Sequence, residues 1–277
     1  MPIFLALLTA LFYGTGDFSG GLASRRTSLV SVVLWSHAIG LVGALLVAPF
    51  FAEPPSGDDL AYGAVGGLFG LAGIVLLYRG LARGPMAVVA PLSAVSSAVV
   101  PLVWGLIDGE RLSLLASAGL ALGLVSIVLV SAERQMAGRA PVQVRTVVEA
   151  LLAGAGFGTF FIFLDLADDA SAPWPIVGAR ALTTSLVLVV ALRVKPSRPT
   201  GNTWWIIAAA GIFDAAANLS FLLATGEGDI TVVSVLSSMY PAATVVLAWV
   251  VLREPIGRVQ ILGLGVAGLA IAMVGFG

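Results

Sequence analysis

The chain begins MPIFLALLTALFYGTGDFSGGLAS (residues 1–24), and its Gly14-Thr15 pair recurs 144 residues later as Gly158-Thr159. The same shift, without a gap, places Gly67 on Gly211, Phe69 on Phe213, Ser93 on Ser237, Glu110 on Glu254 and Gly119 on Gly263. Self-similarity at a fixed period indicates an internal repeat. The sequence therefore predicts a first repeat at residues 1–133, a linker at 134–144 and a second repeat at 145–277.

The composition points to a membrane protein. Apolar residues make up 59% of the chain, charged residues make up 10%, and the mean hydropathy is +1.05. Soluble domains carry about 25% charged residues, so an ordinary soluble protein is excluded. The chain has no cysteine, a single histidine and no acidic cluster with the spacing of metal ligands. We therefore expect no disulfide, no metal site and no cofactor, and no nucleic-acid partner.

Each repeat contains five apolar stretches of membrane length. A helix needs about 20 apolar residues to cross the hydrocarbon core of a bilayer. The ten stretches are 3–23, 29–51, 60–82, 86–107, 112–132, 147–166, 174–193, 203–224, 230–252 and 258–276. Because five is odd, two such repeats in series must lie upside down relative to each other. The predicted fold is all-α and integral to the membrane, with ten transmembrane helices in two inverted five-helix repeats.

The basic residues predict the orientation in the membrane. Twelve of the fourteen Lys and Arg residues fall in the odd-numbered connections, which include the linker between the repeats. Cytoplasmic loops carry an excess of Lys and Arg, so the odd connections and the linker should face the cytoplasm. We expect a multi-pass protein of the bacterial inner membrane, with both termini outside.

Spans four and nine carry Ser and Pro, and each ends near a Glu. The first reads Ala90-Pro91-Leu92-Ser93 through Gly109-Glu110-Arg111-Leu112, and the second Val235-Leu236-Ser237-Ser238 through Arg253-Glu254-Pro255-Ile256. With the duplicated five-span unit, this pattern resembles the drug/metabolite transporter superfamily, in its ten-span type with two EamA domains. The resemblance implies transport of small metabolites and a cavity formed by spans one, three, four, six, eight and nine.

Ionisable side chains inside spans are candidates for function, because they are costly in the membrane unless they face a partner or a cavity. Four of them, Asp17, His37, Arg180 and Asp214, are joined by the polar Asn218 one turn after Asp214. Their depths along the spans predict two pairs, Asp17 with His37 and Arg180 with Asp214. Asp214 should stay charged beside a guanidinium, so we expect Asp17 and His37 to carry coupling protons. Each pair would alternatively serve only to tie two helices together.

Hydroxyl groups in spans four and nine extend the predicted substrate site. Ser93 with Ser97, and Ser234 with Ser238, are spaced four residues apart and so share a helix face. Pro91, Pro101 and Pro241 should interrupt backbone bonding in the same spans, which would then line the cavity and bend. The alternative is that these small residues only allow close packing. The expected substrate-binding residues are Tyr13, Ser93, Ser97, Arg180, Asp214, Asn218, Ser234 and Ser238.

These features predict a secondary active transporter that works by alternating access and exports a small polar or amphipathic metabolite, such as an amino acid. One chain supplies both halves of the cavity, so a monomer is sufficient. The same features fit three other membrane functions: a facilitative or uptake permease, a lipid flippase, and a scaffold or receptor. The alternative from another class is an intramembrane protease with a Ser19–His37 dyad, but we expect no enzyme activity.

Overall fold

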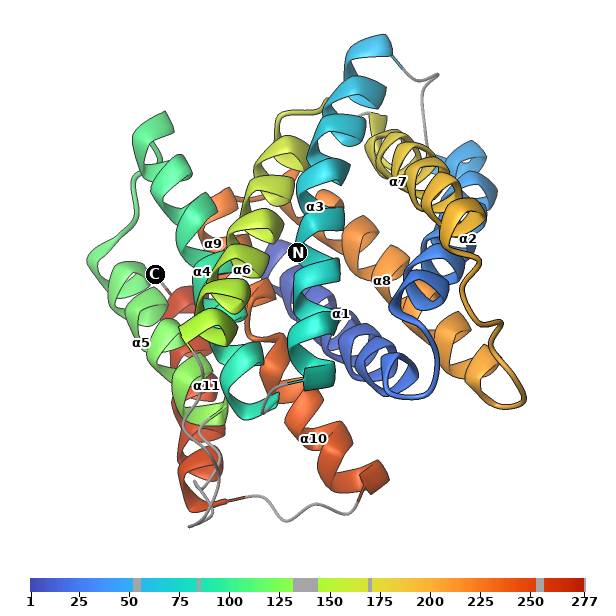
Figure 1. Cartoon of the computed structure of the whole chain (residues 1–277). Coiled ribbons are helices and arrows are strands. Elements are labelled where there is room, and N and C mark those ends of the chain that lie inside the picture. The colour runs from blue at the N-terminus through green and yellow to red at the C-terminus, as the bar shows by residue number, and fades with distance from the viewer. Residues whose placement is uncertain (52–55, 84–85, 132–143, 169–170, 253–256, 277) are drawn as a thin grey trace.

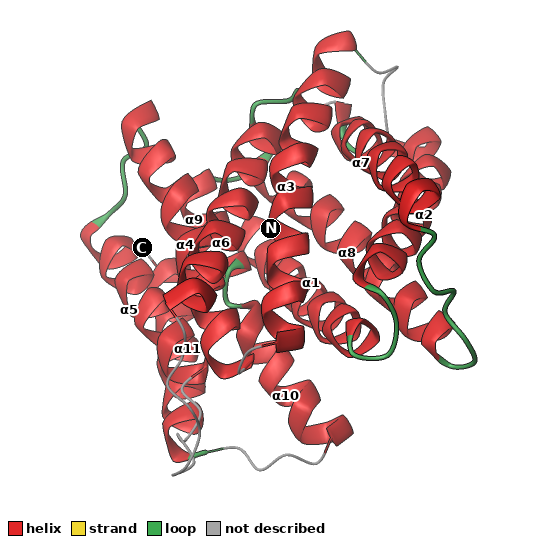
Figure 2. Cartoon of the chain, in the orientation of Figure 1, coloured by secondary structure: helices red, strands yellow, loops and turns green. Residues whose placement is uncertain are grey.

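The computed structural model describes residues 1–51, 56–83, 86–131, 144–168, 171–252 and 257–276 (Figure 1). Figure 2 shows helices joined by loops, and no strand occurs in these residues. The helices are α1 Pro2–Ser24, α2 Leu29–Phe51, α3 Gly57–Arg83, α4 Met86–Asp108, α5 Leu114–Ser131, α6 Val144–Asp165, α7 Trp174–Val194, α8 Thr203–Thr225, α9 Ile230–Ser237, α10 Tyr240–Leu252 and α11 Arg258–Phe276.

Six helices are long and apolar enough to cross a membrane: α1, α2, α3, α6, α7 and α8. Shorter apolar segments occur at Leu92–Asp108, Leu114–Leu129, Ile230–Thr244 and Ile261–Val274. Large apolar side chains such as Val189 and Leu192 are exposed on outer helix surfaces, where lipid would cover them. The chain is therefore a multi-pass membrane protein, whereas ten spans remain a prediction.

The predicted ninth span is divided into α9 and α10 at Ser238-Met239. Pro241 is the second residue of α10, where its missing N–H removes no helical bond. If the ninth span were one unbroken helix, Pro241 would have no N–H to donate to the carbonyl of Ser237, and its ring would clash with that carbonyl. Span four differs from the prediction, because α4 runs as one helix through the positions of Pro91 and Pro101.

The helices pack in reciprocal pairs across the two halves of the chain. α1 packs against α8, and α3 packs against α6. Under the 144-residue shift α1 corresponds to α6 and α3 to α8, so each contact is the counterpart of the other. α2 against α7 and α5 against α11 are contacts between corresponding helices, and Figure 1 shows α5 and α11 side by side. Such reciprocity is what a two-fold relation between the halves would produce.

Two corresponding glycines allow close approach between helices. A Cβ on Gly14 would lie 2.5 Å from the carbonyl oxygen of Tyr240 and 2.6 Å from the Cβ of Ala243. A Cβ on Gly158 would lie 2.7 Å from the Cβ of Val100. Small residues at helix interfaces are the usual basis of close packing in membranes. These two glycines therefore allow α1 to meet α10 and α6 to meet α4.

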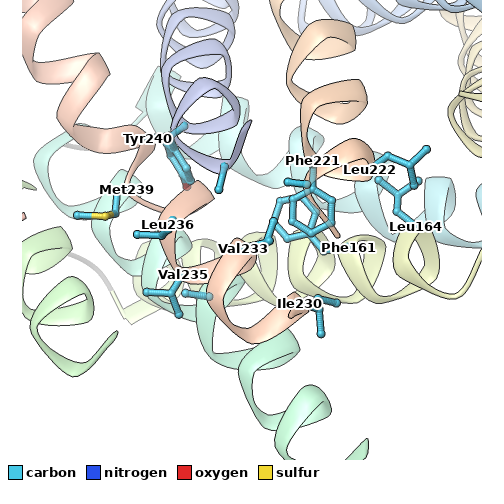
Figure 3. Close-up of a cluster of buried hydrophobic side chains, with 14 of the residues drawn as sticks. Phe161, Leu164, Phe221, Leu222, Ile230, Val233, Val235, Leu236, Met239 and Tyr240 are labelled. Carbon is cyan, nitrogen blue, oxygen red and sulfur yellow. The ribbon is translucent and has the colours of Figure 1, made fainter. Parts of the chain in front are cut away.

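The larger of two buried apolar clusters extends through both halves of the chain, and the residues labelled in Figure 3 come from α6, α8 and the segment from α9 to the start of α10. Phe161 stacks on Phe221 with ring centroids 4.3 Å apart, and Figure 3 shows both rings near Val233. Tyr240, at the start of α10, belongs to the same cluster. Phe161 and Tyr240 of this cluster also line the cavity described next.

Candidate functional site

Two adjoining pockets lie between the halves of the chain. One is lined by Tyr13, His37, Gly67, Gly70, Ile74, Phe157, Phe160, Ala179, Arg180, Thr183, Asp214 and Asn218. The other is lined by Tyr13, Asp17, Ile74, Ser97, Phe157, Phe161, Asp214 and Tyr240. Their empty volumes, open mouths included, are about 350 and 310 Å³. Because they share four residues, we treat them as one cavity. Spans one, three, four, six, eight and nine contribute to it, and α2 and α7 add to them.

Arg180 on α7 and Asp214 on α8 form a hydrogen-bonded ion pair at the cavity, from Nη2 to Oδ2. The Arg180 side chain is 8% exposed and that of Asp214 is 23% exposed. A buried guanidinium requires such a partner, because an unpaired buried charge costs several kcal/mol. The pair was predicted from the similar depths of the two residues along their spans, and the structure contains it.

His37 on α2 bonds to α7 through both ring nitrogens. Its Nδ1 lies 2.9 Å from the Thr183 hydroxyl oxygen, and its Nε2 lies 3.0 Å from Nη1 of Arg180. Arginine has only donors, so Nε2 accepts. The Thr183 hydroxyl donates to the carbonyl of Ala179 at 2.8 Å, so its oxygen accepts from Nδ1. This geometry assigns a neutral imidazole with the hydrogen on Nδ1.

The predicted pairing of Asp17 with His37 does not occur in the described part of the chain. His37 is turned toward α7, because α2 packs against α7 and α8. Asp17, on α1, instead lines the second pocket beside Asp214. No hydrogen bond or ion pair of the Asp17 carboxylate is found with any described residue. Ser19 donates to the carbonyl of Thr15 at 2.8 Å, so no Ser19–His37 dyad forms either.

Asn218 connects the ion pair to α1. Its side-chain amide donates to the backbone carbonyl of Asp214 at 2.7 Å, with a longer contact of 3.4 Å to the Asp214 carboxylate. Tyr13 donates its hydroxyl to Oδ1 of Asn218 at 2.7 Å. One connected chain of polar contacts thus runs from Thr183 through His37, Arg180, Asp214 and Asn218 to Tyr13.

The four predicted serines separate into different environments. The Ser97 and Ser238 hydroxyls lie 3.0 Å apart, joining α4 to the break between α9 and α10. Ser93 accepts from the Tyr240 hydroxyl at 3.4 Å, without lining the cavity itself. Ser234 is fully buried and donates to the carbonyl of Thr231 in its own helix. Only Ser97 among them lines a pocket.

The sequence reasoning missed several residues that line the cavity. Thr183 was not singled out, because one threonine in an apolar span carries no signal. Phe157, Phe160 and Phe161 of α6 were also missed. The repeat alignment contained a usable signal, since Phe157 and Phe161 correspond to Tyr13 and Asp17.

Glu110, at the end of the predicted fourth span, meets the beginning of α9. Its Oε2 accepts from the backbone N–H of Thr231 at 3.2 Å. The first N–H groups of a helix have no partner within the helix, so Glu110 supplies one from the other half of the chain. Its counterpart Glu254 lies outside the described residues.

Comparison with known proteins extends these observations. The sequence profile of the EamA-like transporter family matches twice, at residues 1–132 and 145–276. An uncharacterised protein of Methanocaldococcus jannaschii is 28% identical over 131 residues, which are 47% of this chain and 95% of that protein. That relative is therefore about half as long as this chain.

A crystal structure of a protein that is 20% identical also has the same overall fold. It superposes with a TM-score of 0.75 over 98% of this chain and 95% of its own. At this identity the similarity concerns the fold alone. The family profile covers nearly the whole sequence in two copies, and a cavity lined by both charged and apolar residues lies between them. The chain belongs to the EamA-like transporter family.

Proposed function

We propose that this membrane transporter is a secondary active transporter which moves a small polar or amphipathic metabolite by alternating access, in the direction of export. The observation that carries the proposal is a cavity lined from both halves of the chain, with charged side chains inside apolar helices. Charged groups in such positions mark substrate or ion pathways. A site between two repeats fits the general design of secondary transporters.

The reciprocal packing supports an inverted arrangement of two five-helix repeats, with ten spans in all. In that arrangement, rocking one half against the other would open the cavity to each face in turn. The divided ninth span supports the same mechanism. The break at Ser238-Met239 lies next to Tyr240, which lines the cavity, so α10 can change its angle without bending a continuous helix.

Asp17 is the better of the two proposed proton carriers. Its carboxylate faces the cavity, and no counter-charge binds it among the described residues. His37 uses both ring nitrogens to hold Thr183 and Arg180. A second ring proton would displace the bond from Arg180, so His37 serves to position the guanidinium.

Counterflow in proteoliposomes tests the proposal. Vesicles preloaded with one unlabelled amino acid, nucleoside or organic amine are diluted into a trace of the same labelled compound at two pH values. We expect transient accumulation of at least one compound, and loss of accumulation with Arg180→Gln but not with Asp58→Asn at the exposed start of α3. If the internal label never rises above its equilibrium level for any of these compounds, the proposal is contradicted. Movement of labelled phospholipid without movement of any of these compounds would favour a flippase.

A further inference from the structure

Four pairs of corresponding residues line the cavity together, and in every pair one residue is polar and the other is not. The pairs are Tyr13 with Phe157, Asp17 with Phe161, Asp214 with Gly70, and Asn218 with Ile74, each separated by 144 residues. All eight residues line the cavity. The duplication supplied equivalent positions, which now carry residues of opposite character.

The polar and apolar residues belong to different walls. Tyr13 and Asp17 lie on α1, and Asp214 and Asn218 lie on α8, which packs against α1. We call these four residues the polar wall. Their counterparts Gly70, Ile74, Phe157 and Phe161 lie on α3 and α6, which pack against each other. We call these four the apolar wall. A molecule between the walls would meet hydrogen-bonding groups of the polar wall and hydrocarbon groups of the apolar wall.

The charges in the cavity favour a cation over an anion. Arg180 is the only Lys or Arg among the described residues that line the cavity, and Asp214 neutralises it. Its Nη1 donates to His37, and its buried Nε has no hydrogen-bond partner among the described residues. Asp17 is then the one carboxyl group in the described cavity lining that has neither an ion pair nor a hydrogen bond to a described residue. An anionic ligand would find no basic group without a carboxylate counter-charge in the described cavity lining, whereas an ammonium group would complete an ion pair with Asp17.

Aromatic rings surround the pocket that contains Asp17. Tyr13, Phe157, Phe161 and Tyr240 line the same pocket, and the rings of Tyr13 and Phe161 have centroids 5.8 Å apart. Aromatic faces attract cations through the quadrupole of the ring and bind apolar groups through area burial. Both interactions suit a ligand with an ammonium group attached to a ring or chain.

We infer that the cavity binds an amphipathic organic amine, with its ammonium group paired to Asp17 on the polar wall and its apolar body against Phe157 and Phe161 on the apolar wall. This inference rests on the proposed function and narrows its substrate class. It assigns Asp17 as the residue that selects for charge and Phe157 as a residue that selects for an apolar body.

A ligand series with one common ring tests the inference on the unmodified protein. Phenethylamine, phenylalanine and phenylacetate present a cation, a zwitterion and an anion, and methylamine presents the cation without the ring. Binding is measured by calorimetry on the full-length protein in detergent, with empty micelles as the blank. We expect phenethylamine to bind at least about tenfold more tightly than each of the other three.

Two variants locate the ligand in the cavity. Asp17→Asn keeps the shape of the side chain and removes its charge, so it should weaken phenethylamine binding by about tenfold or more. Asp58→Asn makes the same change at an exposed residue and should leave binding unaltered. Phe157→Leu keeps an apolar side chain without the ring and should reduce the preference for phenethylamine over methylamine. Matching unfolding midpoints establish that the variants are folded.

Three results would overturn the inference: equal binding of phenylacetate or phenylalanine, no binding by any of the four compounds, or full binding by a folded Asp17→Asn variant. Failure of the proposed function is a separate outcome. Phenethylamine binding that depends on Asp17, without counterflow of any compound, would keep the site and reject transport. Counterflow of a compound that is unaffected by Asp17→Asn would support transport and reject the proposed amine site.

Discussion

Nη1 of Arg180 lies 3.0 Å from Nε2 of His37, so that a buried side chain of α7 bonds a buried side chain of α2 in the other half of the chain. The bond matters because His37 and Asp214 together hold the two terminal nitrogens of one guanidinium. The orientation of Arg180 in the cavity therefore depends on three helices.

Replacing His37 should destabilise the protein. His37→Ala leaves Nη1 of Arg180 without its acceptor, and leaving a buried donor unsatisfied costs about 1–3 kcal/mol. Unfolding by denaturing detergent in mixed micelles measures this free energy. Thr183→Val leaves the neutral Nδ1–H of His37 without its acceptor but keeps the acceptor of the charged guanidinium, so it should cost less. An unchanged unfolding free energy for His37→Ala would mean that water or lipid replaces the imidazole.

The Arg180–Asp214 pair should show strong coupling. Removing either partner leaves the other charged in a largely buried site, whereas removing both does not. A double-mutant cycle with Arg180→Ala and Asp214→Ala should give an interaction free energy of roughly 1–3 kcal/mol. Arg145 and Glu149, an i,i+4 pair in which the Arg145 side chain is 65% exposed, should give about 0.3–0.5 kcal/mol. Similar values for the two cycles would contradict the assignment.

Removing the Glu110 carboxylate should loosen the start of α9. Glu110→Ala deletes the acceptor of the Thr231 N–H, and loss of an N-terminal cap costs about 0.5–2 kcal/mol. Hydrogen exchange followed by mass spectrometry should show faster exchange in peptides covering the first turn of α9. Glu110→Gln retains an acceptor oxygen and should show a smaller change. Equal protection in all three proteins would show that the carboxylate contributes nothing to α9.

A methyl group at Gly14 should disrupt the contact between α1 and α10. Gly14→Ala places a Cβ 2.5 Å from a backbone carbonyl oxygen, and overpacking of this kind costs about 1–3 kcal/mol. Gly43→Ala is the matched control, since a Cβ there meets nothing within 4 Å. It should be neutral, or stabilising by up to about 1 kcal/mol through helix propensity. Thermal unfolding in detergent separates the two, and equal midpoints would contradict the packing account.

Much of the helical pattern could be predicted from hydropathy, which is a local property of the sequence. The predicted stretches 29–51 and 203–224 differ from α2 and α8 by no more than one residue at either end. The break in span nine had a local cause in Pro241. The continuity of α4 through Pro91 and Pro101 could not be predicted, because tertiary packing decides whether a proline ends a helix or is accommodated.

The candidate site was predicted less completely. Depth along the membrane normal can be estimated from position in a span, and this identified Arg180 and Asp214 as partners. Depth says nothing about which way a side chain faces around its helix. His37 and Asp17 have similar depths, but α2 directs His37 to α7 while α1 directs Asp17 to the cavity. Knowledge of which helices pack together was needed to separate them.

The opposite character of the two walls has a consequence for any ancestor built from separate halves. Two identical five-helix chains that paired would carry the same side chain at both members of every corresponding pair. A ligand could then enter in two equivalent poses, related by the axis of the pair. In one continuous chain Asp17 and Phe161 are free to differ, and that difference leaves a bound molecule a single preferred orientation. Joining the halves thereby gives the cavity a polarity.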